Sequence, residues 1–188
     1  CLSALMQNSL MERLNLELAA SGKPTLEALL GLSTGDVIAG NIGASQRLNY
    51  TVMGDPVNLA SRLVSVNKLY RTTILATEAT MLMAKDKVCF RALDKVRVKG
   101  RKGSSTVYEV LAPAGALSER TAQCVNYFER ALKHYFSRDF QGALARVEAA
   151  LKSQPQDNPS LILAKRCRDY ISDPPAPDWD GVTVLEAK

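Results

Sequence analysis

Apolar residues recur every three or four positions over residues 1–20, a spacing that predicts an amphipathic helix. The members of this stripe are Leu2, Leu5, Met6, Leu10, Leu14 and Leu16. Gly22 and Pro24 then predict the end of the helix. Short runs rich in apolar residues at 26–32, 36–42 and 48–53 are separated by glycine-containing turns and predict three strands.

A Gly-Asp-Pro corner at residues 54–56 marks the start of a second helix. Aspartate is a favoured N-cap and proline fits the first helical position. We therefore expect Asp55 to cap a helix that begins at Pro56 and ends near Lys68. The elements predicted beyond it are a strand at 72–76, a short helix at 77–84 and a hairpin across 88–112.

The chain becomes helical in pattern after a short linker predicted at 113–118, where alanine, proline and glycine gather. Over 119–172 the order of alanine, leucine and aromatic positions is typical of one tetratricopeptide-like repeat, with a third helix from about Pro159 to Tyr170. A single repeat cannot bury its own apolar face. This tail must therefore pack on the preceding domain, on a partner or on its own copy.

Residues 173–188 contain three prolines and are interpreted as an extended C-terminal tail. Trp179 is the single tryptophan of the chain. Two interpretations stay open for it: it anchors the tail in a groove, or it belongs to a disordered terminus.

Composition places the chain among globular proteins, because 46% of its 188 residues are hydrophobic and 23% are charged. No apolar run reaches the ~18 residues that a membrane helix needs.

The four cysteines contain no CxxC pair and His134 is the single histidine, which argues against a zinc site and favours reduced thiols in the cytoplasm. The sequence begins inside a predicted helix, so we interpret it as a fragment, and a membrane-anchored parent stays open.

Positive charge gathers between residues 85 and 102, where eight basic residues face two acidic ones and give 8 − 2 = +6, against a net charge of +5 for the chain. The basic residues are Lys85, Lys87, Arg91, Lys95, Arg97, Lys99, Arg101 and Lys102. Two interpretations fit this cluster: a surface for an anionic partner, or a solvated strand pair with lysines on its edges.

Candidate functional residues lie on both sides of the Gly-Asp-Pro corner at residues 54–56. The preceding strand delivers Thr51, and the N-terminus of the following helix favours anions. Asn58 and Arg62 are four positions apart and share one face of that helix, whereas Leu63 and Val66 suit the core. An amide, a guanidinium and a hydroxyl together suit a phosphate and nucleoside site, although such residues on a helix face are commonly just solvated.

Three segments resemble the catalytic domain of class III adenylate/guanylate cyclases. They are STGDVIAGNIG at 33–43, YTVMGDPVNLASRL at 50–63 and VRVKGRKG at 96–103. The resemblance covers residues 1–112. It implies an α+β fold, a ferredoxin-like nucleotidyl cyclase sandwich that is N-terminally incomplete here, with an antiparallel sheet, helices on one face and the tetratricopeptide-like helical tail after it.

The resemblance also implies roles for single residues. Asn58 would orient the ribose, and Arg62 would stabilise charge on the reacting phosphate, a task that suits a planar and always charged guanidinium. Lys99 would hold the terminal phosphates, with Lys102 as the weaker candidate. Thr51 occupies the purine-reading position, where threonine favours ATP over GTP.

The implied reaction makes 3′,5′-cyclic AMP and pyrophosphate from ATP by attack of the ribose 3′ oxygen on the α-phosphorus. The resemblance also implies two Mg²⁺ or Mn²⁺ ions, a homodimer with head-to-tail catalytic domains and sensor domains upstream. The two metal-binding aspartates of the family precede this sequence, and neither Asp36 in its turn nor Asp55 at the corner replaces them. We therefore expect no metal ligands here, and no activity from the fragment alone.

Other functions are compatible with the same residues. The first is a non-catalytic cyclase-like domain that regulates or dimerises, and the second is a guanylate cyclase. The third is a nucleic-acid binder that uses the basic hairpin. Only Phe90 and Tyr108 are aromatic near that hairpin, and readers of single strands need more stacking partners, so we expect no nucleic acid.

Overall fold

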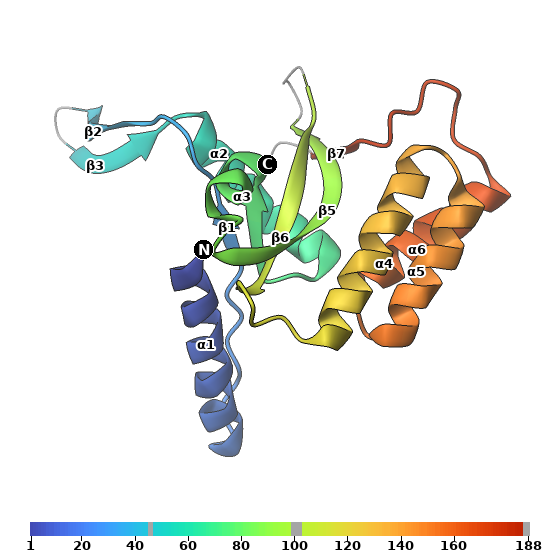
Figure 1. Cartoon of the computed structure of the whole chain (residues 1–188). Coiled ribbons are helices and arrows are strands. Elements are labelled where there is room, and N and C mark those ends of the chain that lie inside the picture. Colours follow the sequence, from blue (N-terminus) through green and yellow to red (C-terminus); the bar gives the residue numbers. More distant parts are fainter. Residues whose placement is uncertain (45–46, 99–102, 186–188) are drawn as a thin grey trace.

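The structure, a computed structural model, describes residues 1–44, 47–98 and 103–185. Within them the chain forms helices and strands in the order expected for residues 1–172, and a short strand follows (Figure 1). The helices are α1 (Leu2–Ala20), α2 (Asp55–Tyr70), α3 (Glu78–Ala84), α4 (Glu119–Phe136), α5 (Phe140–Ser153) and α6 (Asn158–Ser172). The strands are β1 (Leu30–Leu32), β2 (Ile38–Ala44), β3 (Arg47–Met53), β4 (Ile74–Thr77), β5 (Val88–Val98), β6 (Ser105–Pro113) and β7 (Thr183–Leu185).

The main sheet has five strands in the order β1-β4-β6-β5-β7. Its inner pairs are antiparallel, but β1 runs parallel to β4 and β7 runs parallel to β5. The sheet is therefore mixed: its inner pairs are antiparallel as expected, and its two edge strands pair in parallel, which was not expected. Strands β2 and β3 form a separate antiparallel hairpin that projects from the body of the molecule (Figure 1).

Helices cover both faces of the main sheet, contrary to the expected single face. Strand β4 shows this through its alternation, since Leu75 joins the core beneath α2 whereas Ile74 and Ala76 join a smaller cluster with Ala4 of α1. The mixed α+β architecture that the sequence predicted is confirmed.

The larger core is shared between the sheet, α2 and the C-terminal helices. Leu63 and Val66 of α2 meet Leu93 of β5 and Phe128 of α4 in one cluster. The helical tail thus buries its apolar face on the preceding domain, which was one of the three options left open. Three helices occur where they were expected, and their likeness to a tetratricopeptide repeat stays a prediction.

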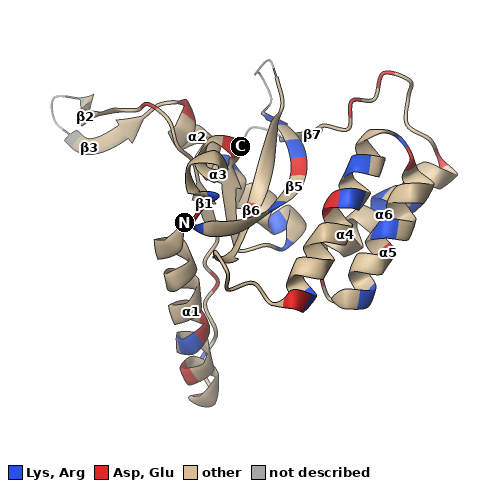
Figure 2. Cartoon of the chain, viewed as in Figure 1, with Lys and Arg blue, Asp and Glu red and all other residues tan. Residues whose placement is uncertain are grey.

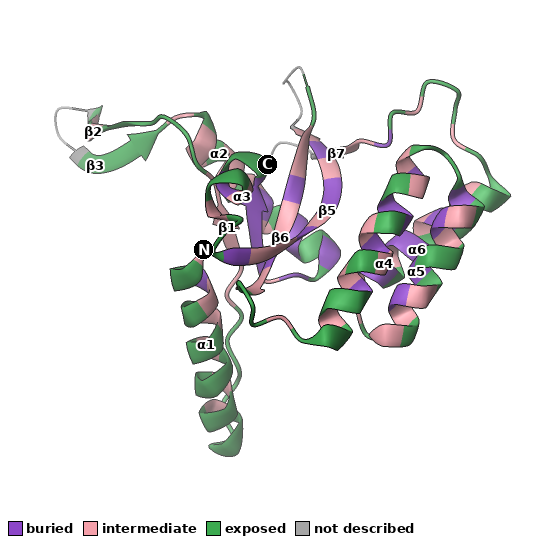
Figure 3. Ribbon diagram, in the orientation of Figure 1, coloured by how far each residue is buried: buried purple, intermediate pink, exposed green. Residues whose placement is uncertain are grey.

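Helix α1 extends away from the sheet with its apolar stripe largely uncovered (Figure 3). Ala4 is its buried residue, whereas Met6 and Leu16 are 64% and 73% exposed. The chain then returns along the helix, where the Asn15 side chain bonds both the amide and the carbonyl of Leu26 at 2.8 Å. Because these backbone groups are bonded to a side chain, the strand predicted at 26–32 is reduced to β1.

The C-terminal tail is ordered by aromatic contacts and by a strand pairing. Trp179 lies edge-on to Tyr135 and Phe140 of the helical tail at ring distances of 5.2 and 5.6 Å. Further on, β7 pairs with residues Val96–Val98 of β5. Of the two interpretations of Trp179, the anchor is the one observed. Among the described residues, no helix has the length and apolar character needed to cross a membrane.

Candidate functional site

Helix α2 starts at the Gly-Asp-Pro corner, one residue earlier than expected. Gly54 is the N-cap, with a φ of 150° that favours glycine, and a Cβ there would lie 3.2 Å from the carbonyl oxygen of Asp36. Asp55 therefore occupies the first turn of the helix rather than its cap. A carboxylate in a first turn is favourable because the N-terminus carries partial positive charge.

Close packing against β1 sets the position of α2. A Cβ at Gly31 would lie 2.1 Å from the carbonyl oxygen of Ala60, so only glycine lets the helix approach this closely. Further along, the buried Asn67 donates to the Leu30 carbonyl at 2.9 Å and accepts from the Thr72 hydroxyl at 2.9 Å. These contacts turn Leu63 and Val66 inward, while Asn58 on another face of the helix is exposed.

Arg62 is half-buried one turn after Asn58, and its guanidinium has an unusual environment. The Nη1 atom is enclosed by protein, yet it makes no hydrogen bond within the described part of the chain. Buried donors in folded proteins nearly always have a partner. This nitrogen therefore lacks, among the described residues, the partner that burial normally requires.

Among the other predicted site residues, the structure describes Thr51 and does not join it to this pair. Thr51 lies on β3 opposite Gly40 of β2 and is exposed in the projecting hairpin. No hydrogen bond between described residues links Thr51 to Asn58 or Arg62. Lys99 and Lys102 lie outside the described residues, directly after the end of β5. The structure therefore presents Asn58 and Arg62 on one helix and leaves the meeting of all four residues a prediction.

A cavity of about 400 Å³ lies beside the N-terminus of α2. Asp55, Pro56 and Leu59 line it from α2, and Thr34 and Ser105 also line it. Asn58 and Arg62 do not line it. This cavity is adjacent to the candidate site but is not built by the residues that the sequence selected.

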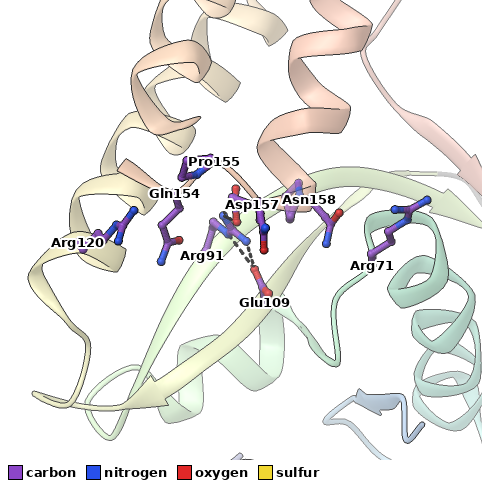
Figure 4. A pocket seen from close by; sticks show the side chains of 10 residues that line it. Arg71, Arg91, Glu109, Arg120, Gln154, Pro155, Asp157 and Asn158 are labelled. Atoms are coloured by element: carbon purple, nitrogen blue, oxygen red, sulfur yellow. Dashed lines mark hydrogen bonds and ion pairs between the residues drawn. The ribbon is translucent and has the colours of Figure 1, made fainter. Parts of the chain in front are cut away.

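A larger cavity of about 530 Å³ lies where the helical tail meets the sheet (Figure 4). At its centre the buried Arg91 pairs with Glu109 and donates to both carboxylate oxygens of Asp157, at 2.9 and 2.8 Å. Burial raises the pKa of Glu109 even though Arg91 opposes this shift. Because Arg91 is satisfied within the chain, and Arg71 and Arg120 stand at opposite ends, this cavity is centred on a structural ion cluster.

Other members of the basic cluster contact the helical tail and the C-terminal tail. The charged positions of β5 lie opposite the C-terminal helices (Figure 2). The ammonium of Lys95 lies 4.5 Å from the ring centre of Phe136, and Arg97 pairs with Asp180 at 2.5 Å. For Arg91 and Arg97 the anionic partner suggested by charge alone is an aspartate, Asp157 or Asp180, whereas Lys95 contacts an aromatic ring. This docking role was not predicted from the sequence. One signal was available: Asp94 is an acid within an otherwise apolar and basic strand pattern.

Metal binding was expected to depend on residues outside this chain. No group of three or more His, Cys, Asp or Glu side chains in residues 1–44, 47–98 and 103–185 is arranged to hold a metal ion. The described residues therefore do not by themselves fit a divalent-metal site.

Comparison with known proteins gives a family for residues 1–112, which match the family described as "Adenylate and Guanylate cyclase catalytic domain". Adenylate cyclase 1 of Rhizobium meliloti (strain 1021) is 40% identical over 122 residues, which cover 65% of this chain and 18% of that protein. The terminal-differentiation specific adenylate cyclase of Dictyostelium discoideum is 30% identical over 153 residues, which cover 78% of this chain and 7% of that protein. The chain thus spans a small part of each relative.

A solved structure is also similar. The adenylyl cyclase CyaB from P. aeruginosa matches with 30% identity and a TM-score of 0.52, over 61% of this chain and 58% of that one.

The family match covers 112 of the 188 residues, whereas the alignment with the Dictyostelium protein covers 78% of the chain. The Dictyostelium alignment therefore extends beyond residue 112 into the helical tail.

Proposed function

This chain belongs to the adenylate and guanylate cyclase catalytic-domain family, and from that premise we propose that it works within a longer adenylate cyclase that converts ATP into 3′,5′-cyclic AMP and pyrophosphate. One observation carries the proposal: α2 presents the exposed amide of Asn58 and, one turn later, a guanidinium of Arg62 whose Nη1 has no partner among the described residues. Both residues stand in the segment that resembles the family motif.

The proposed roles follow from the chemistry of these side chains. The Asn58 amide can donate to and accept from ribose oxygens. The Arg62 guanidinium stabilises negative charge on the α-phosphate as the ribose 3′ oxygen attacks and pyrophosphate leaves. A charged group of this kind, positioned before the reaction starts, acts most strongly on charge that develops in the transition state.

Two more residues complete the proposed substrate site. Thr51 would accept a hydrogen bond from the adenine amino group, and Lys99 would bind the terminal phosphates. The position of Thr51 on the projecting hairpin is compatible with a site completed by a second catalytic domain, since members of this family bind ATP and act as dimers. We infer a homodimer with head-to-tail catalytic domains for the complete protein.

Divalent metal ions are general in this family. We propose that the complete protein binds two Mg²⁺ or Mn²⁺ ions through aspartates that lie outside these 188 residues. When bound, such ions neutralise phosphate charge and favour departure of pyrophosphate. The residues of this chain contribute orientation of the ribose and stabilisation of the phosphate.

The test compares the complete protein with its Arg62→Ala and Arg62→Lys variants, using ATP and GTP as alternative substrates. We expect cyclic AMP from the wild type, turnover about 100-fold lower with alanine, and partial recovery with lysine. Arg168→Ala is the matched control, because Arg168 forms an exposed ion pair with Glu148 inside the tail.

Three results would contradict the proposal. Normal turnover of Arg62→Ala would remove Arg62 from the site. Cyclic GMP as the main product would favour the guanylate cyclase, and a complete protein that makes neither product would favour the non-catalytic domain. The 188-residue chain alone should produce no cyclic AMP.

A further inference from the structure

Asp94 on β5 is a fully buried carboxylate that the proposed reaction does not use. Strand β5 has an irregular register between Ala92 and Asp94, and the amide of Ala92 is bonded by Glu129 of α4 at 2.9 Å. Neighbouring residues of a regular strand point to opposite faces. The irregularity lets the consecutive Leu93 and Asp94 both be buried, each at 1% exposure. A charge in such a place costs free energy unless it is well bonded.

Four hydrogen bonds satisfy this carboxylate, and three of them come from other elements. Oδ2 accepts from the hydroxyl of Tyr70 at the end of α2, from Arg166 of α6 at 3.1 Å and from the hydroxyl of Thr183 of β7 at 2.7 Å. Oδ1 accepts from the amide of Lys95 at 2.8 Å. One side chain therefore joins the sheet, α2, the helical tail and the C-terminal strand.

The protonation state of Tyr70 suits its role as a hydrogen-bond donor to Asp94. Burial, together with the charge of Asp94, raises the pKa of Tyr70, so its hydroxyl keeps its proton and donates at physiological pH. The guanidinium of Arg166 also lies over the Tyr70 ring, 5.4 Å from its centre. The end of α2 is thus held by both a hydrogen bond and a cation–π contact.

A contact at Tyr70 acts on Arg62 because both belong to one helix. Their separation of eight residues corresponds to roughly 12 Å along the axis. The middle of α2 is held on β1 where Ala60 and Leu63 lie against Gly31, and Asn67 bonds Leu30 close to Tyr70. A change at Tyr70 therefore alters how α2 is seated on the sheet, and α2 carries both Asn58 and Arg62.

The same C-terminal segment borders the strand that leads to Lys99. Residues Thr183–Leu185 pair with Val96–Val98, and Asp180 pairs with Arg97. Strand β5 ends at Val98, directly before Lys99. The segment that bonds Asp94 therefore also supports the base of the basic hairpin.

We propose that Asp94, Arg166 and Thr183 are positioning residues of the cyclase reaction, which set α2 through Tyr70 and make the helical tail a working part of the catalytic domain. This inference rests on the proposed function. The three residues act on the substrate only through α2 and β5. Small displacements of groups that orient a substrate lower turnover strongly, because reacting atoms must be aligned.

The first experiment needs no activity and uses the 188-residue chain. Amide hydrogen exchange is measured in α2 for Thr183→Val, which removes the hydroxyl at constant size, for Thr183→Ser, which keeps it, and for the control Arg168→Ala. We expect exchange in residues 63–70 to rise roughly five-fold with valine, the factor for one hydrogen bond, and to stay at the wild-type rate with serine and with the control. Tyr70→Phe, which severs the same link from the α2 side, should behave like Thr183→Val.

The second experiment uses the complete protein. Thr183→Val should lower kcat several-fold without raising KM for ATP, and Thr183→Ser should restore it. Unchanged exchange in α2 for both Thr183→Val and Tyr70→Phe would overturn the inference, and so would raised exchange with normal kcat. If the complete wild-type protein makes no cyclic nucleotide, the proposed function fails, and the exchange measurement alone decides whether the tail positions α2.

Discussion

Arg91 on β5 and Asp157 at the N-terminus of α6 form a buried ion pair through two hydrogen bonds of 2.9 and 2.8 Å. Their side chains are 4% and 9% exposed. Asp157 also caps α6 by accepting from the amide of Ser160 at 3.0 Å. The start of the last helix and the central sheet therefore depend on the same carboxylate, so the tail and the sheet should unfold together.

Replacing Arg91 by methionine should lower the free energy of unfolding by about 3–5 kcal/mol, because it leaves Glu109 and Asp157 buried without their cation. Urea unfolding followed by circular dichroism measures this. Asp157→Asn, which keeps a capping oxygen, is the comparison variant and should cost less. A loss below about 1 kcal/mol for Arg91→Met would show that water reaches these carboxylates.

Much of the fold could be predicted because its signals are local. Helix α2 was expected to end near Lys68 and ends at Tyr70. The prediction was close because the signals behind it, a Gly-Asp-Pro corner and an apolar period, act within a few residues. The strand expected at 26–32 is shortened to Leu30–Leu32 for a non-local reason. The Asn15 side chain takes both backbone groups of Leu26, and no periodicity in residues 26–32 reveals a partner eleven positions away.

The charge pattern was less informative than the hydrophobic pattern. Eight basic residues between 85 and 102 suggested either an anionic ligand or a solvated edge. Arg91, Lys95 and Arg97 instead contact the tail, through Asp157, Phe136 and Asp180. Spacing along one strand shows that charge is concentrated, but not which distant segment neutralises it.

The candidate site was predictable as a motif and not as a geometry. The spacing of Asn58 and Arg62 on one helix face follows from helical period alone, and both lie on α2 as expected. The hydrogen bonds that hold α2 could not be predicted from the sequence, because the residues that make them are far apart along the chain. These residues are Tyr70, Asp94, Arg166 and Thr183. Whether Thr51 and Lys99 join the pair depends on a second domain and stays a prediction.

Gly31→Ala should destabilise the chain and displace α2. The new Cβ would meet the Ala60 carbonyl oxygen at 2.1 Å, and neither backbone can yield without moving the helix. We expect a loss of about 1–3 kcal/mol, as for other overpacked sites. Gly40→Ala is the matched control, because a Cβ there has no atom within 4 Å. Equal stabilities of the two variants in urea would mean that α2 packs less tightly on β1 than described.

Thiol reactivity should divide the four cysteines into two pairs. Burial raises the pKa of Cys124 and of Cys167 to about 11, so at neutral pH both remain thiols and are shielded from reagents. Cys1 and Cys89 are partly exposed. Titration with a chromogenic disulfide should therefore show two fast thiols in the native chain and four in denaturant. Rapid reaction of all four without denaturant would contradict the core shared by α4 and α6.

Arg138 should decide whether the C-terminal tail stays docked. Its guanidinium donates to the carbonyls of Pro175 at 2.7 Å and Ala176 at 2.8 Å, and lies 5.7 Å from the Trp179 ring centre. Removing it should release the tail and shift the emission of the single tryptophan to longer wavelength, with easier quenching by acrylamide. Arg168→Ala, which leaves the tail contacts intact, should not change the emission.

The backbone at Arg138 sharpens this test, because its φ of 65° is left-handed and favours glycine. Arg138→Ala and Arg138→Gly both remove the guanidinium, so both should give the same red-shifted emission. The glycine variant should nevertheless be more stable by about 1 kcal/mol, since it relieves the left-handed strain that alanine keeps. If Trp179 emission stays at the wild-type wavelength in both variants, the aromatic contacts to Tyr135 and Phe140 hold the tail without Arg138.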